Sequence, residues 1–206
     1  LGRRVEHTWY PQRFGFIRNT LRATVAEEKR FKCDLVIGVP VGYELTSTTQ
    51  PYYRSTYALV YVKGKGFDGV QHPRDLLGLE PGRLKNLKVG VFVQSPAVDW
   101  MLKYGLIDNA VSYQKQTSDP DRYPGEVLEK DLVAGTIDMA FIWGPIAGYF
   151  AKKVKSVSLA VIPLQSEPAI KFDYSIAMGV RHGERDWKAQ IEKALERNQP
   201  RIDAIL

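Results

Sequence analysis

The feature that most constrains the fold of this chain is the alternation of short apolar runs with amphipathic helical segments. Seven apolar runs are predicted to form strands, at residues 5–10, 34–39, 57–62, 88–93, 137–142, 158–164 and 174–180. Helical patterns lie between them, and short apolar strands separated by helices are typical of a parallel sheet that is covered on both faces. The sequence therefore predicts an α/β fold.

The predicted helices carry start and stop signals. A helix after Pro11 would place Phe14, Ile17, Leu21 and Val25 on one face. A second helix would begin at Pro96 with Ser95 as its N-cap, which is a common arrangement at helix starts. Further helices are predicted at residues 125–134, 145–153 and 184–198, and Pro200 is expected to break the last of them.

Composition excludes several classes of protein. The 29 Lys and Arg residues only slightly outnumber the 23 Asp and Glu residues, and they are scattered, so nucleic-acid binding is not expected. Cys33 is the only cysteine, which rules out an internal disulfide and a thiolate metal site. No apolar run approaches the roughly 20 residues that span a bilayer, so membrane insertion is not expected either.

Two loops are interpreted as boundaries between two lobes, because each separates a finished strand from a new unit. The first is the glycine-rich stretch 64–69, and the second is the polar stretch 165–171. Lobe 1 would comprise residues 1–63 and 173–206, and lobe 2 residues 64–172. Two connections between two lobes make a hinge, for which the candidate residues are Gly64, Gly66, Ser166 and Pro168.

Gly64, Gly66 and Gly69 have the G-x-G-x-x-G spacing of dinucleotide-binding loops. In those loops a helix begins at the third glycine, and its backbone amides hold the pyrophosphate. Here the first possible helical turn lies near Asp75, too far along the chain. A flexible connector is therefore favoured over a nucleotide-binding loop, and a nucleotide-using oxidoreductase is a remote third possibility.

Residues with catalytic or metal-binding potential show no known arrangement. His7, His72 and His182 have no carboxylate or cysteine at ligand spacing, so no metal site is predicted. The sequence lacks the G-x-S-x-G, P-loop and H-E-x-x-H patterns. We therefore predict a protein that is not an enzyme and has no cofactor.

Aromatic residues gather where predicted strands end. The residues expected to line a ligand cleft are Trp9, Tyr10, Arg13, Tyr43, Tyr52, Tyr53, Tyr57, Gln94, Ser95 and Trp143. In open α/β sheets ligands bind at the carboxyl ends of strands, so these positions would face a common apolar cleft. The alternative is that Trp9, Tyr43 and Trp143 simply cover the ends of the sheet.

Several segments resemble a known family over nearly the whole chain. Cys33-Asp-Leu-Val-Ile-Gly-Val-Pro and Pro51-Tyr-Tyr-Arg-Ser-Thr-Tyr-Ala-Leu-Val resemble two-lobed periplasmic solute-binding proteins of the amino-acid-receptor type, with a type II fold. Trp9-Tyr-Pro-Gln-Arg, Pro40-Val-Gly-Tyr-Glu and Ile142-Trp-Gly-Pro-Ile are similar to the MxaJ and XoxJ subfamily, which is encoded with quinoprotein methanol dehydrogenases. The resemblance implies a sheet flanked by helices in each lobe. It also implies that the first strand and helix of lobe 1, which should precede Val5, are missing.

The chain departs from amino-acid receptors at each polar anchor. Ala58 stands where they hold the ligand carboxylate with an arginine. Ser95-Pro-Ala replaces their Gly-Thr-Thr, and Trp143-Gly-Pro replaces the residue that contacts the ligand ammonium. A buried ionised ligand without such partners would cost several kcal/mol, so amino-acid binding is disfavoured.

The resemblance implies a periplasmic, non-enzymatic accessory or activation factor, monomeric on its own. It would bind a PQQ-containing methanol dehydrogenase, in its mature or apo form, and its cytochrome, through a wide hydrophobic cleft. Whether a lanthanide or a calcium enzyme is served stays open. The alternative is a receptor for a small apolar or aromatic solute that feeds an ABC transporter.

Overall fold

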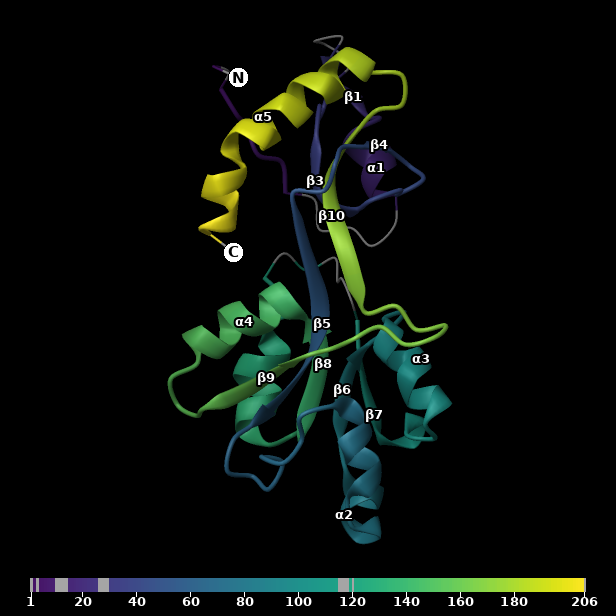
Figure 1. The fold of residues 1–206 in the computed structure, drawn as a ribbon, viewed down its shortest axis with the longest axis vertical. Helices are drawn as coiled ribbons and strands as arrows, with labels where there is room; N and C mark the ends of the chain where they lie inside the picture. The colour runs from purple at the N-terminus through teal and green to yellow at the C-terminus, as the bar shows by residue number, and fades with distance from the viewer. Residues whose placement is uncertain are drawn as a thin grey trace. The chain divides into compact units, whose positions relative to one another are not determined.

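The computed structural model describes residues 2, 4–9, 15–25, 30–114, 119 and 121–205. The chain forms two compact units, of which unit 1 comprises residues 1–55 and 174–206, and unit 2 comprises residues 56–173. The chain passes between them twice, within β5 (Tyr53–Val62) and within β10 (Asp173–Val180) (Figure 1).

Unit 1 is organised around β10, which pairs antiparallel with β3 (Val36–Pro40) and with β4 (Ser47–Thr48). Its remaining elements are α1 (Phe16–Asn19), the ribbon of β1 (Thr24–Val25) and β2 (Arg30–Phe31), and α5 (Arg185–Asp203). A small core forms where Ile17 and Leu21 pack on Val36 and Val39 of β3.

Unit 2 is built on a five-stranded sheet with the order β9-β5-β8-β6-β7. The strands are β6 (Val89–Phe92), β7 (Ala110–Tyr113), β8 (Met139–Trp143), β9 (Leu159–Pro163) and the unit 2 part of β5. The strand β6 runs parallel to β7 and β8, whereas β5 runs antiparallel to both β8 and β9. In unit 1 the strands β3, β4 and β10 pair antiparallel, contrary to the expected parallel sheet, whereas in unit 2 parallel pairing holds among β6, β7 and β8, with β5 as the exception. The strand β5 runs in the opposite direction because it brings the chain from unit 1 into unit 2, whereas β9 leads the chain back toward unit 1.

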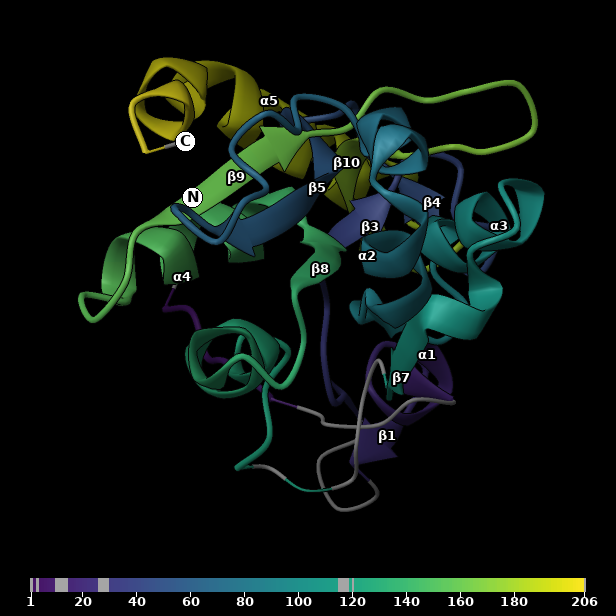
Figure 2. The ribbon, with the colours of Figure 1, turned by 90° about the horizontal axis from the view of Figure 1, so that it is seen from below.

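Helices cover both faces of this sheet (Figure 2). On one face, α3 (Pro96–Lys103) and η1 (Pro73–Gly78) pack over a cluster that includes Leu59, Trp100 and Phe141. On the other face, α4 (Gly144–Lys153) and η3 (Val127–Leu132), which is a π-helical turn, pack over Val60 and Ile142. Successive residues of β5 point to opposite faces, as the pleat of a strand requires. The short elements α2 (Pro81–Asn86) and η2 (Ile107–Asn109) complete the unit. The predicted α/β class, with sheets flanked by helices, is confirmed.

Three local predictions are wrong. Residues 5–9 form no strand, and the helix expected after Pro11 is reduced, in its described part, to α1, which begins after Gly15 with φ of 71°. β-Branched Thr24 and Val25 lie in β1 instead, in keeping with the preference of such residues for strands. The helix α5 continues through Pro200 to Asp203, since only one backbone hydrogen bond is lost at a proline and the chain rejoins the helical pattern through the N–H of Ala204.

The unit boundary also differs from the expected lobe boundary. Residues 57–62 belong to unit 2 because they pair with β8 and β9, so the chain crosses after Ser55 and not at Gly64. The return crossing lies after Asp173, one residue beyond the expected position at 172.

Candidate functional site at one edge of unit 2

Part of the predicted site lies at the edge of the unit 2 sheet where β6 and β8 end. Here Tyr57 is the register partner of Trp143, and the two half-buried rings meet edge to face with centroids 5.4 Å apart. Such a pair stabilises by about 0.5–1.5 kcal/mol beyond the area that it buries. Tyr57 and Trp143 therefore form a fixed aromatic feature of this edge.

The turn after β6 brings Gln94 and Ser95 to the same edge. Gln94 is exposed and has φ of 59°, a left-handed conformation that is uncommon outside glycine. Ser95 is 3% exposed, and its hydroxyl has no hydrogen-bond partner among the described residues. Its side chain does not cap α3, and Pro96 at the first helical position supplies no N–H donor.

The anchor positions of amino-acid receptors are apolar here. Ala58 is 1% exposed and packs in the core with Val60 and Ile142. Trp143 precedes α4, whose first turn holds Gly144 and Pro145 and no acidic residue. Neither position offers a charge to the carboxylate or ammonium group of an amino acid.

Unit 1 carries the other described site residues. Trp9 is 84% exposed, with its ring stacked 6.3 Å from that of His7. The rings of Tyr52 and Tyr53 meet edge to face at 5.0 Å, and burial, followed by the neighbouring Tyr53, raises the pKa of Tyr52. Tyr43 is half-buried against the unit 1 core.

The structure thus brings together Tyr57, Gln94, Ser95 and Trp143 at one edge of unit 2. Tyr10 and Arg13 lie outside the described residues. A common site that joins residues of both units stays a prediction.

The proposed hinge residues are held by local contacts within unit 2. The N–H of Gly64 donates to the carboxylate of Asp68 at 3.0 Å, which closes the glycine loop. The hydroxyl of Ser166 accepts the N–H of Phe172 at 2.8 Å and contacts the Asp173 carboxylate. A hinge function for Gly64, Gly66, Ser166 and Pro168 stays a prediction.

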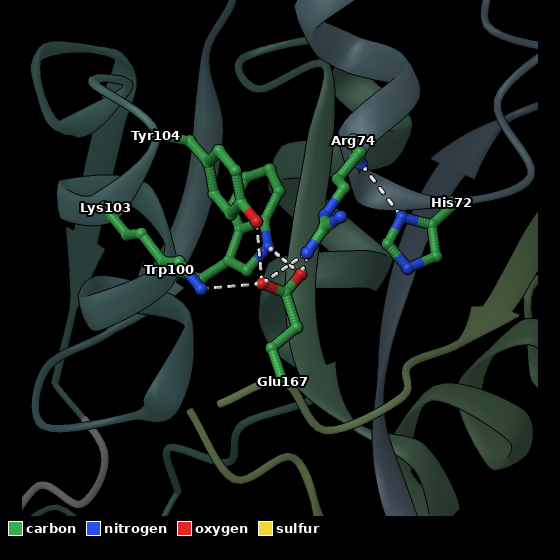
Figure 3. Close-up of polar contacts among 6 residues, drawn as sticks. All are labelled: His72, Arg74, Trp100, Lys103, Tyr104 and Glu167. Carbon is green, nitrogen blue, oxygen red and sulfur yellow. Dashed lines mark hydrogen bonds and ion pairs between the residues drawn. The ribbon is translucent and has the colours of Figure 1, made fainter. Parts of the chain in front are cut away.

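A buried carboxylate that was not predicted from the sequence lies in the segment that leads back to unit 1. The side chain of Glu167 is 7% exposed and accepts hydrogen bonds from four side chains (Figure 3). The Tyr104 hydroxyl donates at 2.7 Å, the Lys103 ammonium at 3.0 Å, and the Trp100 indole N–H and the Arg74 Nε–H at 3.2 Å each. A terminal nitrogen of Arg74 also forms an ion pair with the carboxylate at 2.9 Å. The i, i+3, i+4 spacing of Trp100, Lys103 and Tyr104 was the available signal, because it places three donors on one helical face.

These contacts change the acidity of Glu167. The Arg74 guanidinium, and then Tyr104, Lys103 and Trp100, lower its pKa far below the ordinary value of 4.5, although burial opposes this shift. Glu167 is therefore ionised at neutral pH and fixes the return segment to α3 and η1.

A chain of aromatic contacts connects this cluster with the edge. The ring of Tyr57 lies 6.3 Å from that of Phe172, Phe172 stacks 6.5 Å from Phe141, and Phe141 lies 5.6 Å from Trp100. Trp100 in turn donates to Glu167. The position of Tyr57 and Trp143 is thus supported by the core beneath α3.

In the part of the chain that the structure describes, no group of three or more His, Cys, Asp or Glu side chains is placed to hold a metal ion. In the same residues, no helix is both long enough and apolar enough to cross a bilayer.

An α/β chain that crosses twice between two units, each with a sheet flanked by helices, has the fold of the periplasmic binding proteins. The structure of periplasmic binding protein XoxJ from Methylobacterium extorquens AM1 matches with a TM-score of 0.71 and 31% identity, over 98% of this chain and 78% of that one. This chain belongs to the MxaJ and XoxJ subfamily of that fold.

Two further comparisons give a curated relative and a second solved structure. Protein MoxJ of Paracoccus denitrificans is 29% identical over an alignment 188 residues long, and the match covers 84% of this chain and 65% of that protein. This chain thus spans less than two thirds of that relative. The structure of MxaJ from Methlophaga aminisulfidivorans MPT matches with a TM-score of 0.68 and 24% identity, over 84% of this chain and 73% of that one, and this likeness shows the fold alone. No family model matches the sequence.

Proposed function

We propose that this chain is a periplasmic, non-catalytic accessory factor of a methanol-oxidation system, and that it binds a PQQ-containing methanol dehydrogenase. The observation that carries the proposal is the edge of unit 2, where Tyr57 and Trp143 form an aromatic pair and the anchor positions for a charged ligand are apolar. The relationship to XoxJ supports the periplasmic location and the link to methanol oxidation.

Aromatic side chains suit a protein partner. Tryptophan and tyrosine are enriched among the residues that dominate binding energies, because a large rigid ring buries much area at little cost in conformational entropy. The pair is also held in place before binding, since Tyr57 packs on Phe172. A segment of the dehydrogenase with exposed apolar side chains, as in an incompletely assembled form, would bury that surface here.

Charge would assist the encounter. The chain has a net charge of +6, which favours approach to an acidic partner and has less effect on the final affinity. The same positive charge would favour approach to a cytochrome that acts with the dehydrogenase, provided that the cytochrome surface is acidic as well.

Calorimetry with purified methanol dehydrogenase tests the proposal. The apo and PQQ-loaded enzymes should be titrated in separate arms, with both lanthanide- and calcium-dependent dehydrogenases. We expect saturable binding in at least one arm, and a loss of roughly tenfold or more in affinity for Trp143→Ala and for Tyr57→Ala. Tyr149→Ala is a matched control, since Tyr149 is 62% exposed on α4 of the same unit and lies outside the proposed surface.

Two results would contradict the proposal: no binding in any arm, or equal losses in Tyr149→Ala and Trp143→Ala. The four-arm design also identifies which form of the enzyme is recognised. Tyr43→Ala and Tyr52→Ala then test whether unit 1 contributes to the same interface.

A receptor for a small apolar or aromatic solute is the second candidate. The observation that favours it is the buried hydroxyl of Ser95, which lacks a partner among the described residues and could bond a polar group on a bound solute. A thermal-shift screen of neutral aromatic solutes should then give a hit that is lost in Ser95→Ala. A hit that persists in this variant would argue against the edge as the solute site.

A further inference from the structure

A second feature lies at the opposite edge of the unit 2 sheet, where β5 ends and β8 begins. A pocket of about 330 Å³ opens there, and we call it the basal pocket. Its apolar wall includes Phe67, Leu132 and Ile137. Its polar groups are Lys65, Arg83, Asn86 and Asp138. Because Tyr61 pairs with Met139 at this end and Tyr57 pairs with Trp143 at the other, the pocket is separate from the surface proposed above.

The guanidinium of Arg83 is held in position inside this pocket. Its central carbon lies 4.1 Å from the centroid of the Phe67 ring, and one of its terminal nitrogens donates to the carbonyl of Lys65 at 2.6 Å. Stacking on an aromatic face with one hydrogen bond fixes the plane of the guanidinium. The remaining N–H groups are then directed in a defined geometry.

The glycine loop is shaped around this arginine. Gly66 has φ of 80°, and a Cβ at that position would lie 2.7 Å from both terminal nitrogens of Arg83. Any other residue at position 66 would therefore displace the guanidinium. The spacing that resembles a nucleotide-binding loop is explained in part by this contact.

Arg83 makes no ion pair with a carboxylate in the described part of the chain, although it lines the pocket together with Asp138. The carboxylate of Asp138 accepts the backbone N–H of Lys88 at 2.8 Å. Lys65 and Arg83 supply two positive charges to the lining and Asp138 one negative charge, so the lining carries an excess of one positive charge. An oriented arginine that is not paired with a carboxylate among the described residues, beside an apolar wall, is suited to an anion with an apolar body.

We propose that the basal pocket binds a small monocarboxylate with an apolar body. The carboxylate would accept hydrogen bonds from Arg83 and Lys65, and the body would lie against Phe67 and Ile137. The volume of about 330 Å³ is at the lower end of the range for ligand pockets, which limits the ligand to about the size of an arylacetate.

Calorimetry with phenylacetate and phenylacetamide tests this assignment, since the two probes have the same shape and differ in charge. We expect saturable binding of phenylacetate and binding of phenylacetamide that is weaker by about tenfold or more. Arg83→Gln should reduce the difference between the probes, because only Lys65 would then remain to bind the carboxylate, whereas Lys85→Gln, on the same helix but outside the lining, should preserve it. Asp138→Asn should strengthen phenylacetate binding, because it removes the only negative charge of the lining.

Phenylacetate and phenylacetamide are compared on the unaltered protein, so the comparison tests whether the pocket prefers a carboxylate even if Arg83→Gln fails to fold. Absence of phenylacetate binding, or equal affinity for both probes, would overturn the assignment. Since Trp143→Ala leaves this pocket intact, phenylacetate binding should survive in that variant. The proposal for the basal pocket and the proposal for the partner surface can therefore be disproved independently of each other.

Discussion

The indole N–H of Trp100 donates to the carboxylate of Glu167 across 3.2 Å, so the return segment of the chain is bound directly to the core helix α3. Trp100 is fully buried, and its ring is also in contact with Phe141 in the centre of the unit 2 sheet. The segment is further closed by two backbone hydrogen bonds between Glu167 and Ile170, each 2.9 Å long. Part of the polar stretch 165–171 is therefore a turn that is anchored to unit 2 through Glu167.

Glu167→Gln should destabilise the protein. The substitution removes the negative charge that compensates Arg74 and Lys103 and weakens four hydrogen bonds to a buried group. Because both cations are substantially exposed, we expect a moderate decrease of about 1–3 kcal/mol in the free energy of unfolding. Urea denaturation measures it, and Glu80→Gln, at an exposed acidic residue before α2, should change stability by less than about 0.5 kcal/mol. A neutral effect of Glu167→Gln would mean that the cluster does not stabilise unit 2.

The same carboxylate predicts a pH dependence. Its pKa is lowered in the folded protein by the Arg74 guanidinium above all, from an ordinary value of 4.5. A group with a lowered folded pKa contributes its full stability above the unfolded pKa and loses it as the pH falls toward the folded value. The difference in stability between the unaltered protein and Glu167→Gln should therefore be largest near neutral pH and shrink below pH ~4.5. Denaturation curves of both proteins from about pH 7 to about pH 3 check this, and a constant difference would contradict it.

A double-mutant cycle can measure the contact between Tyr57 and Trp143. The rings meet edge to face, so Tyr57→Ala and Trp143→Ala should show a coupling of about 0.5–1.5 kcal/mol in unfolding free energy. Additive effects within about 0.3 kcal/mol would indicate that the rings do not support each other. The cycle also separates the stability of the edge from its affinity for a partner, which calorimetry measures independently.

Much of unit 2 could be predicted from the sequence because its strands are continuous apolar runs and its helices have clear boundaries. The elements β6, β8, α3 and α4 each begin within about two residues of the expected position. The strand β7 was missed because it has only four residues, too few for a clear pattern, and it is placed as an edge strand by parallel pairing with β6. The direction of β5 depends on where the chain enters the unit, which local patterns do not encode.

For similar reasons, residues at the edge of unit 2 could be proposed from the sequence, whereas the Glu167 cluster and Arg83 could not. Trp143 and Ser95 could be placed because each follows a recognisable strand, and strand ends share an edge. The cluster around Glu167 depends on residues separated by about a hundred positions, from Arg74 to Glu167, and no local pattern joins them. Arg83 was missed because its role follows from the conformation of Gly66 and from a stacking contact with Phe67.

Two substitutions in the glycine loop separate backbone strain from the loss of the Arg83 contact. Gly64 and Gly66 have similar φ values, 76° and 80°, but a Cβ at Gly64 would meet nothing within 4 Å, whereas one at Gly66 would meet Arg83. Gly64→Ala should therefore cost only the strain of a left-handed alanine, about 1 kcal/mol. Gly66→Ala should cost the same strain plus the displacement of Arg83 from Phe67.

Urea denaturation measures the stability of both variants, and the extra loss in Gly66→Ala should disappear in an Arg83→Gln background. If the two alanine variants were equally stable, Arg83 would be free to move aside, and the loop would not hold its guanidinium in place.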